Sequence, residues 1–536
     1  MAEAPGVFQR RIVIGAGLCV AAFALVGIRL VDVTLMQAAL RGGSADHAVV
    51  ARADLTDRNG ELLARDLPVQ DLYARPHVFW DKLQAAHDLA AATGADERRL
   101  RAGFENAKHP YVLVARQLTP DAQAKVMHLG LPGLEFEPSA KRYYPDGRAA
   151  AQILGVTDPD NKGISGLELG LQDRLQAQGN EGAVATSIDM RVQYILAHET
   201  EAAREMFTAH AAGGVVMDVN TGEIIAMVSL PDFDPNGRRL TGGDSTRNIM
   251  AQDVYELGSV FKIFTFALGL QDHTFNLDEM FKIGSGYKIG KSTIHEAAED
   301  HMPDMLAGRD VLARSSNIGS LQIALRSGGV RQKQFLAELG LLKPVHGELP
   351  ETARPLYPAN WGTIETATIG FGHGISVSPL SYVTAAAEVV NGGRRITPTF
   401  LKQDGDRRGE QVINPQTSLQ MRDLLRYVVT DGTGKKADVV GYDVGGKTGS
   451  AQVPGPNGHY LAHALRTSFC AVFPVHNPRY VLFVLLDQPH GTKATGGLAL
   501  AGYTAAPLAG KVISRIAPLL GVPNEPPPIR LAGSNS

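Results

Sequence analysis

The sequence predicts an α+β protein with an N-terminal transmembrane helix, an elongated membrane-proximal α+β module, and a larger distal domain. In the distal domain we expect an antiparallel sheet flanked by helices, together with a helical subdomain. Three observations favour this arrangement: an uncharged stretch near the N-terminus, short strand and turn patterns after it, and strand patterns at both ends of a long helical middle. Apolar residues make up 44% and charged residues 20% of the 536 residues, which excludes a largely disordered chain.

The charge balance and the cysteine count exclude several classes of protein. Lys and Arg number 52 and Asp and Glu number 55, a net charge of −3 that argues against a nucleic-acid-binding protein. Two cysteines are too few for a disulfide framework or a Cys-rich metal site. Cys19 lies in the uncharged N-terminal stretch, so we expect no pairing with Cys470 in the distal domain.

Residues 12–28 carry no charge, and Arg10 and Arg11 precede them. Seventeen residues are the short end of a spanning helix, and apolar residues up to 36 extend it. The arginine pair places the N-terminus in the cytoplasm and the bulk of the chain outside. The alternative is a cleaved signal peptide, but the run exceeds a usual signal core and no small-x-small site closes it.

The next part of the chain shows short strand patterns and turns. Asp57–Gly60 and Tyr144–Gly147 are typical turn sequences. Thr119 is expected to cap a short helix that has Pro120 in its first turn. We therefore expect a mixed module of small strands and helices here.

The distal part begins with a helical stretch and a hairpin signal at Asn220-Thr221-Gly222. We expect helices at 191–210, 259–271, 309–327, 330–339, 376–391, 416–430 and 504–520, and strands at 215–219, 223–229, 439–444, 466–473 and 480–487. These patterns divide the chain into a cytoplasmic tail (1–11), an anchor (12–36), a membrane-proximal module (37–185), a distal domain (186–522) and a disordered tail (523–536).

Ser259 and Lys262 open an apolar helical stretch as a Ser-x-x-Lys motif. Residues three apart share a helical face, and burial among apolar side chains disfavours the charged form of Lys262, which suits it to act as a base for the serine hydroxyl. The helix N-terminus offers backbone N–H groups to an oxyanion. A second copy, Ser285 with Lys288, lies among glycines with no apolar helix after it, so we assign the chemistry to the first.

Ser315 and Asn317 flank Ser316 between two helical stretches. A spacing of two residues does not put both side chains on one helical face, so a turn must aim them at one point. Alone, this pattern is also a helix N-cap.

Lys447, Thr448, Gly449 and Ser450 follow two glycines. In an extended segment Lys447 and Gly449 share one face, and a glycine there lets a ligand backbone come close. The lysine and the neighbouring hydroxyls suit a ligand that carries a carboxylate.

In this order, the three motifs are those of the penicillin-binding proteins and serine β-lactamases, and the chain resembles that superfamily over residues 186–521. The N-terminal half is similar to the class B penicillin-binding proteins at Arg58–Ala64, Arg142–Pro145 and Gly163–Glu168. Asp218–Glu223, Phe233–Asn236 and Gly370–Gly374 are similar to the division-specific (septal) D,D-transpeptidases of that class.

The resemblance implies a penicillin-binding, serine β-lactamase-like fold and a role for each motif. Ser259 attacks the penultimate D-alanine carbonyl of a peptidoglycan stem peptide, Lys262 activates it, and an amine of a second stem peptide takes the acyl group. Penicillins would acylate Ser259 as substrate mimics. Ser315 and Asn317 relay protons and bind the peptide, Lys447, Thr448, Gly449 and Ser450 form the carboxylate-binding strand, and the backbone N–H groups of Ser259 and Ser450 form the oxyanion hole.

The resemblance also implies location and partners. It predicts a single-pass protein of the bacterial inner membrane, with an extracytoplasmic enzyme domain at the division septum. It implies a membrane glycan polymerase of the FtsW type and other division proteins as partners, and no cofactor, metal or nucleic acid. Alternatives within the superfamily are an elongation-specific transpeptidase and a non-catalytic sensor or scaffold. A lactamase would need a water-activating group, for which the sequence offers no clear residue.

Two other patterns point to different chemistry. Gly441–Thr448 matches the phosphate-binding loop G-x-x-x-x-G-K-[ST], but the Pro- and Gly-rich sequence after Thr448 cannot form the helix that such a loop must open. His459 and His463 are four residues apart and could share a helical face around a metal, although no Glu follows His459 as in HExxH. His373, between two glycines, is expected to shape a turn near the site.

Overall fold

The computed structural model describes residues 17, 20–27, 29, 51–106, 110–237, 243–297, 302–455, 457 and 459–524. Residues from Ala51 onward form one compact unit, and the residues before it form another. Most of the predicted anchor, 12–36, lies outside the described residues, as does the predicted C-terminal tail beyond Asn524. Residues 20–27 are helical, and none of the helices that the structure describes has the length and apolarity needed to cross a membrane.

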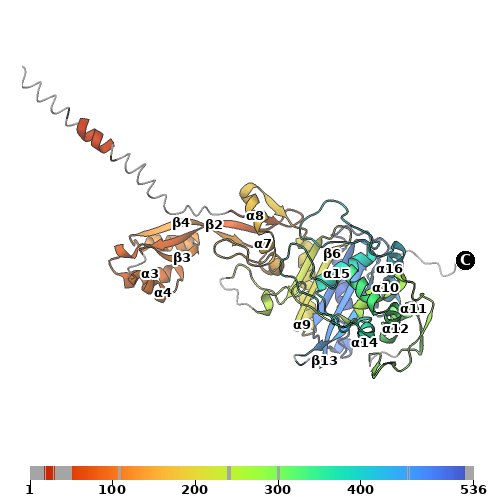
Figure 1. The fold of residues 1–536 in the computed structure, drawn as a ribbon. Coiled ribbons are helices and arrows are strands. Elements are labelled where there is room, and N and C mark those ends of the chain that lie inside the picture. Colours follow the sequence, from red (N-terminus) through yellow and green to blue (C-terminus); the bar gives the residue numbers. More distant parts are fainter. Residues whose placement is uncertain are drawn as a thin grey trace, which may run out of the picture. The chain divides into compact units, whose positions relative to one another are not determined.

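The membrane-proximal module is built on a five-stranded sheet. The long strand β2 pairs antiparallel with β1, β3 and β4, and β5 joins β1 in parallel. Leu72, Leu89, Phe104 and Val126 form part of the apolar cluster between this sheet and three helices (Figure 1). The elements are β1 (Asp54–Thr56), β2 (Leu62–Ala74), α3 (Lys82–Thr93), α4 (Glu97–Glu105), β3 (Val112–Leu118), α5 (Pro120–His128), β4 (Leu134–Tyr143) and β5 (Ala183–Ala185).

The predicted helix cap and the two predicted turns of this module are confirmed. The Thr119 hydroxyl accepts a hydrogen bond from the Ala122 N–H at 3.3 Å and caps α5. The predicted turns close with backbone hydrogen bonds from Gly60 to Asp57 and from Gly147 to Tyr144.

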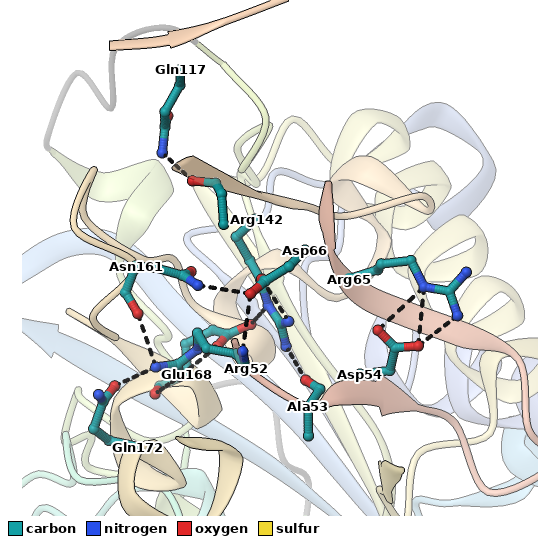
Figure 2. Close-up of polar contacts among 11 residues, drawn as sticks. Arg52, Ala53, Asp54, Arg65, Asp66, Gln117, Arg142, Asn161, Glu168 and Gln172 are labelled. Carbon is teal, nitrogen blue, oxygen red and sulfur yellow. Dashed lines mark hydrogen bonds and ion pairs between the residues drawn. The ribbon is translucent and has the colours of Figure 1, made fainter. Parts of the chain in front are cut away.

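A buried ion network holds the base of this module together (Figure 2). Glu168, on α7 (Gly166–Gly170), accepts hydrogen bonds from Arg52 Nη2 at 2.8 Å and from Arg142 Nε at 2.7 Å. Arg142 Nη1 also lies 3.0 Å from Asp66 Oδ1. The side chains of Arg52, Glu168 and Arg142 are at most 1% exposed. Buried charges are tolerated only when they are paired and hydrogen-bonded, so this network fixes β2, β4 and α7 relative to one another.

Short polar contacts connect this module to the distal domain. The Asp57 carboxylate accepts from the Met190 N–H at 3.2 Å, and Arg58 pairs with Glu223 at 3.3 Å. Asn236 forms two hydrogen bonds with the backbone of Tyr144, at 3.0 and 2.8 Å. Except for Met190, which begins α9, these residues belong to turns and loops of both parts, so the turn sequences serve as attachment points.

The distal domain is built on an antiparallel sheet in the order β12-β13-β14-β6-β7. Side chains alternate along β14: Leu482 and Val484 pack with α9 and α17, and Phe483 and Leu485 pack in the core that includes α10, α15 and α16. The strands are β6 (Ala211–Asp218), β7 (Ile224–Leu230), β12 (Gly445–Pro454), β13 (Tyr460–Phe473) and β14 (Tyr480–Asp487). The helices are α9 (Met190–Met206), α10 (Lys262–Gln271), α15 (Pro379–Val390), α16 (Pro415–Thr430) and α17 (Ala505–Ile516), with α11 (Gly308–Ala313), α12 (Asn317–Ser327), α13 (Gly329–Glu338) and α14 (Thr363–Ile369) in the helical part.

Two predicted elements differ from the structure. The predicted helix 309–327 is broken between α11 and α12, where Ser315 adopts a left-handed conformation with φ 65°. The predicted strand 439–444 is wrong, because the strand begins at Gly445. Tyr442 and Val444 are buried without entering the sheet, whereas Val440 is exposed. A Cβ on Gly446 would lie 2.6 Å from the Phe469 ring, so a residue with a side chain would clash at this position of the pair between β12 and β13.

Glu388 is an ionisable side chain in the otherwise apolar helix α15. It is 2% exposed, its Oε1 accepts from the Ile396 N–H at 3.1 Å, and its buried Oε2 has no hydrogen-bond partner within the described residues. Burial raises the pKa of Glu388 to about 7.

Replacing Glu168 by Gln is expected to lower the free energy of unfolding by about 3 kcal/mol, because Arg52 and Arg142 would stay buried without a full anionic partner. Denaturant unfolding of the purified protein measures the change. Arg65→Ala is the control, since its ion pair with Asp54 is half exposed and should contribute less than about 1 kcal/mol. Equal losses in the two variants would contradict a structural role for the buried network.

Glu388→Gln is expected to stabilise the protein above neutral pH and to have little effect near pH 4.5. The raised pKa means that the unfolded chain loses this proton first, so the Glu388 carboxyl costs stability as pH rises from 4.5 to about 7. The cost above pH 7 is about 3 kcal/mol, since the pKa rises from 4.5 to about 7 and each unit corresponds to 1.36 kcal/mol. Urea unfolding of both proteins at pH 5 and pH 8 tests this, and a difference independent of pH would refute it.

Candidate active site

A cavity of about 470 Å³ lies beside β12, the edge strand of the distal sheet. All three sequence motifs reach it, although they are far apart in the chain. Its lining includes Ser259, Arg314, Ser315, Asn317, His373, Lys435, Lys436, Thr448, Ser450 and Tyr503.

Ser259 lies in a 3₁₀ turn, η6 (Gly258–Phe261), that continues into α10. In a 3₁₀ turn, residues three apart are aligned, which puts Ser259 and Lys262 on the same side. The turn is held on two sides. A Cβ on Gly258 would lie 2.8 Å from Ser450 O, and the Gly258 N–H donates to Gly372 O at 3.2 Å. The nucleophile candidate is therefore fixed between β12 and the turn at Gly372.

Lys262 is fully buried behind the cavity. Its Nζ donates to Ser315 O at 2.5 Å, to Asn317 Oδ1 at 2.8 Å and to Ser315 Oγ at 3.2 Å. A buried ammonium requires such partners, and three oxygens match its three donors. The second motif thus provides the oxygen atoms that solvate the lysine of the first.

The turn expected between Ser315 and Asn317 takes a particular form. Ser315 has φ 65°, a region that a residue other than Gly adopts only at an energetic cost. Ser316 then caps α12 by accepting from the Gly319 N–H at 2.9 Å. This backbone reversal is what allows Ser315 and Asn317 to reach the same lysine.

Lys447 lies on β12 and is also fully buried. Its Nζ donates to Ser315 Oγ at 2.9 Å and to Thr448 O at 3.0 Å. The Ser315 hydroxyl consequently lies between the ammonium groups of Lys262 and Lys447. This arrangement gives a continuous hydrogen-bonded path between the two lysines.

The rest of β12 shapes one side of the cavity. Thr448 Oγ1 hydrogen-bonds with Thr433 Oγ1 at 2.7 Å, and Ser450 Oγ accepts from the Ala501 N–H at 3.1 Å. A Cβ on Gly449 would lie 2.7 Å from Leu257 O, so the close approach at this glycine comes from the chain's own η6 region. Thr448 and Ser450 are therefore the side chains of β12 that a ligand could meet.

His373 lines the cavity, as its predicted place in a turn near the site indicated, whereas Arg314, Lys435 and Lys436 belong to none of the sequence motifs. His373 lies between the rings of Phe371 and Tyr460, at 5.3 and 5.9 Å between centroids. Burial lowers the pKa of His373, which favours the neutral imidazole. Its Nδ1 has no hydrogen-bond partner in the described part of the chain. Arg314, Lys435 and Lys436 add positive charge to the lining, which suits an anionic ligand.

The competing motifs take other structures. Ser285 is exposed next to the short strand β9 (Tyr287–Ile289), away from the cavity lining. Thr448 is followed by strand rather than by helix, so the phosphate-loop interpretation is wrong. His463 lies in strand β13, which removes the shared helical face proposed for it and His459.

Comparisons with known proteins agree with this architecture. Residues 212–513 match the family described as Penicillin binding protein transpeptidase domain, and residues 47–201 match the Penicillin-binding Protein dimerisation domain. The chain is 39% identical over 506 residues to a probable peptidoglycan D,D-transpeptidase FtsI of Caulobacter vibrioides, covering 92% of this chain and 85% of the relative. The peptidoglycan D,D-transpeptidase FtsI of Escherichia coli K12 is 29% identical, covering 89% and 86%.

Solved structures show the same fold. A crystal structure of penicillin-binding protein 3 from Mycobacterium tuberculosis in complex with aztreonam superposes with a TM-score of 0.70 at 25% identity. The match covers 89% of this chain and 98% of that one. A second structure of that protein, in complex with ampicillin, matches equally well, with a TM-score of 0.70.

Proposed function

The chain belongs to the class B penicillin-binding proteins and is a division-specific peptidoglycan D,D-transpeptidase, and we propose that its acyl transfer runs through a covalent intermediate on Ser259. One observation carries the assignment of the site. The Ser315 hydroxyl bonds both Lys262 and Lys447 at the cavity that Ser259 lines. A nucleophile next to a hydrogen-bonded relay of this kind is typical of acyl transfer.

Before the acylation step, the Lys262 ammonium gives up one proton to solvent. Ser259 Oγ then forms a bond to the penultimate D-alanine carbonyl carbon, and the neutral Lys262 amine accepts the hydroxyl proton. The C–N bond to the terminal D-alanine then breaks. Its amine receives a proton along the path from Lys262 through Ser315, which Lys447 holds in place. The backbone N–H groups of Ser259 and Ser450 stabilise the oxyanion.

Substrate binding uses the charge of the cavity. Thr448 and Ser450 line the cavity and contact the terminal carboxylate of the stem peptide, with Gly449 between them. Lys447, a buried residue of the same strand, provides positive charge next to these two hydroxyls. Asn317, which lines the cavity and holds Lys262, orients the peptide backbone.

The second step regenerates the enzyme. The amine of another stem peptide attacks the ester carbonyl and gives a proton to Lys262. The bond to Ser259 Oγ breaks, and Lys262 passes that proton to the serine. The product is a peptide crosslink. A β-lactam forms the same ester on Ser259 but leaves no small amine to depart, so the adduct persists.

The N-terminal residues and the family together support a location. Residues 1–11 lie in the cytoplasm and residues 12–36 anchor the chain in the bacterial inner membrane, as Arg10, Arg11 and the uncharged run favour. The membrane-proximal module (37–185) and the transpeptidase domain (186–522) then lie outside the cytoplasm at the division septum. There the enzyme works with a membrane glycan polymerase of the FtsW type and other division proteins.

Intact-mass analysis after incubation with a β-lactam tests the nucleophile. We expect one adduct on the wild-type protein and none on Ser259→Ala, because the ester needs this hydroxyl. Ser285→Ala is the matched control, since it removes the serine of the second Ser-x-x-Lys motif and should keep the full adduct. An adduct on Ser259→Ala, or its loss in Ser285→Ala, would contradict the assignment.

Turnover separates the enzyme from a penicillin-binding sensor. We expect the wild-type protein to release D-alanine from a stem-peptide analogue. Lys262→Met should reduce that rate by about 10²- to 10⁴-fold, the usual contribution of a general base. Wild-type acylation by penicillin without any D-alanine release would favour a sensor.

A further inference from the structure

A carboxylate from outside the helix occupies the N-terminus of α12. Glu296 accepts a hydrogen bond from the Ser316 hydroxyl at 2.5 Å, from the Asn317 N–H at 2.7 Å and from the Ile318 N–H at 3.1 Å. The first turn of a helix leaves its N–H groups without partners inside the helix, and a negative charge there is favourable. Glu296 therefore binds the same short segment that presents Asn317 to Lys262.

These contacts are not needed to start the helix. Ser316 already caps α12 through the Gly319 N–H, as an ordinary N-cap residue does. Glu296 instead fixes the residues next to Ser315, whose left-handed backbone is costly and must be held by its surroundings. Backbone bonds from the Ser315 N–H to Leu312 O and from the Ser316 N–H to Val311 O hold the start of this turn, and Glu296 holds the two residues after it.

Glu296 is itself held by a packed hairpin. It follows β9 and β10 (Ser292–Ile294), which pair antiparallel. Tyr287, Ile289 and Ile294 of this hairpin pack against Leu321 of α12 and against Phe371. The carboxylate thus comes from an element that also contacts the turn leading to Gly372, which bonds the residue before Ser259.

Two lysines bond to the segment that this carboxylate holds. Lys262 lies one residue away, through Asn317, and Lys447 lies on the other side of Ser315. Arg314 at the end of α11 and the positive end of the α12 dipole face the same region. Glu296 is the carboxylate that contacts the Ser316–Ile318 segment, so its negative charge offsets that of the neighbouring cations.

We propose that Glu296 is a positioning residue for acyl transfer, which fixes the Ser315–Asn317 turn on Lys262 and balances the positive charge beside it. The inference rests on the proposed role of Ser259 and Lys262. Glu296 lies outside the three motifs, and in this role it holds Ser315 and Asn317 in position next to Lys262.

The test compares Glu296→Gln, Glu296→Asp and the wild-type full-length protein in detergent. The second-order rate of acylation by a chromogenic cephalosporin is measured between pH 5 and pH 9. Glu296→Gln should slow acylation at least about 10-fold, since the Asn317 and Ile318 N–H groups bond different oxygens of the carboxylate and a Gln amide replaces one of these oxygens by an NH₂ donor. Its acid limb should move to lower pH, because the ammonium of Lys262 loses its proton more readily without the nearby anion. Glu296→Asp keeps the charge and should restore part of the rate.

Glu365→Gln is the matched control. Glu365 accepts from the Gly362 N–H at 2.9 Å at the N-terminus of the neighbouring helix α14, outside the cavity lining. This variant should acylate at the wild-type rate, even if its unfolding temperature falls as much as that of Glu296→Gln. Wild-type acylation by Glu296→Gln would overturn the inference. So would slow acylation with an unmoved pH profile and no recovery in Glu296→Asp. If wild type itself is not acylated on Ser259, the proposed function fails instead.

Discussion

The site depends on the burial of one ammonium group, that of Lys262. The lysine projects from an apolar helix, and it can stay there only if oxygen atoms replace its water. Ser315 and Asn317 provide those atoms from a segment more than fifty residues further along the chain. That requirement accounts for the break between α11 and α12, for the left-handed backbone at Ser315, and for the position of the Ser315 hydroxyl next to Lys447. The need to hydrogen-bond the buried Lys262 ammonium thus brings the three motifs together.

Close backbone approach is the second constraint on the site. Gly258, Gly372 and Gly449 lie where a Cβ would collide with the backbone of a neighbouring segment. Their absence of side chains lets η6, the turn at 372 and strand β12 pack directly on one another. Because these contacts are between backbones, they leave little freedom in the position of Ser259. The glycines therefore permit the close backbone packing that fixes Ser259, and the residues next to them in the sequence carry the functional groups.

The motifs in the membrane-proximal module have a structural explanation. Arg142 and Glu168, which belong to the class B sequence patterns, pair with each other and with Arg52 out of contact with water. Asp57 and Asn236 bond the backbone across the boundary with the distal domain. None of these side chains lines the catalytic cavity. These polar side chains hold strands and turns in place. The polar sequence patterns of this module therefore have a structural role.

The sequence by itself determined what depends on neighbours along the chain. The three-residue spacing of Ser259 and Lys262, the apolar surroundings that distinguish them from Ser285 and Lys288, and the cap at Thr119 were all predictable, because each involves one element. Only the tertiary structure decided which residues meet across elements. Strand β12 begins at Gly445 rather than at 439, and at Gly446 the Phe469 ring leaves no room for a Cβ. Glu296 has no spacing rule that would connect it to the site, since its contacts arise from how a hairpin packs on α12. His373 was expected near the site from its place between two glycines, but its contact with Tyr460 of β13 is tertiary.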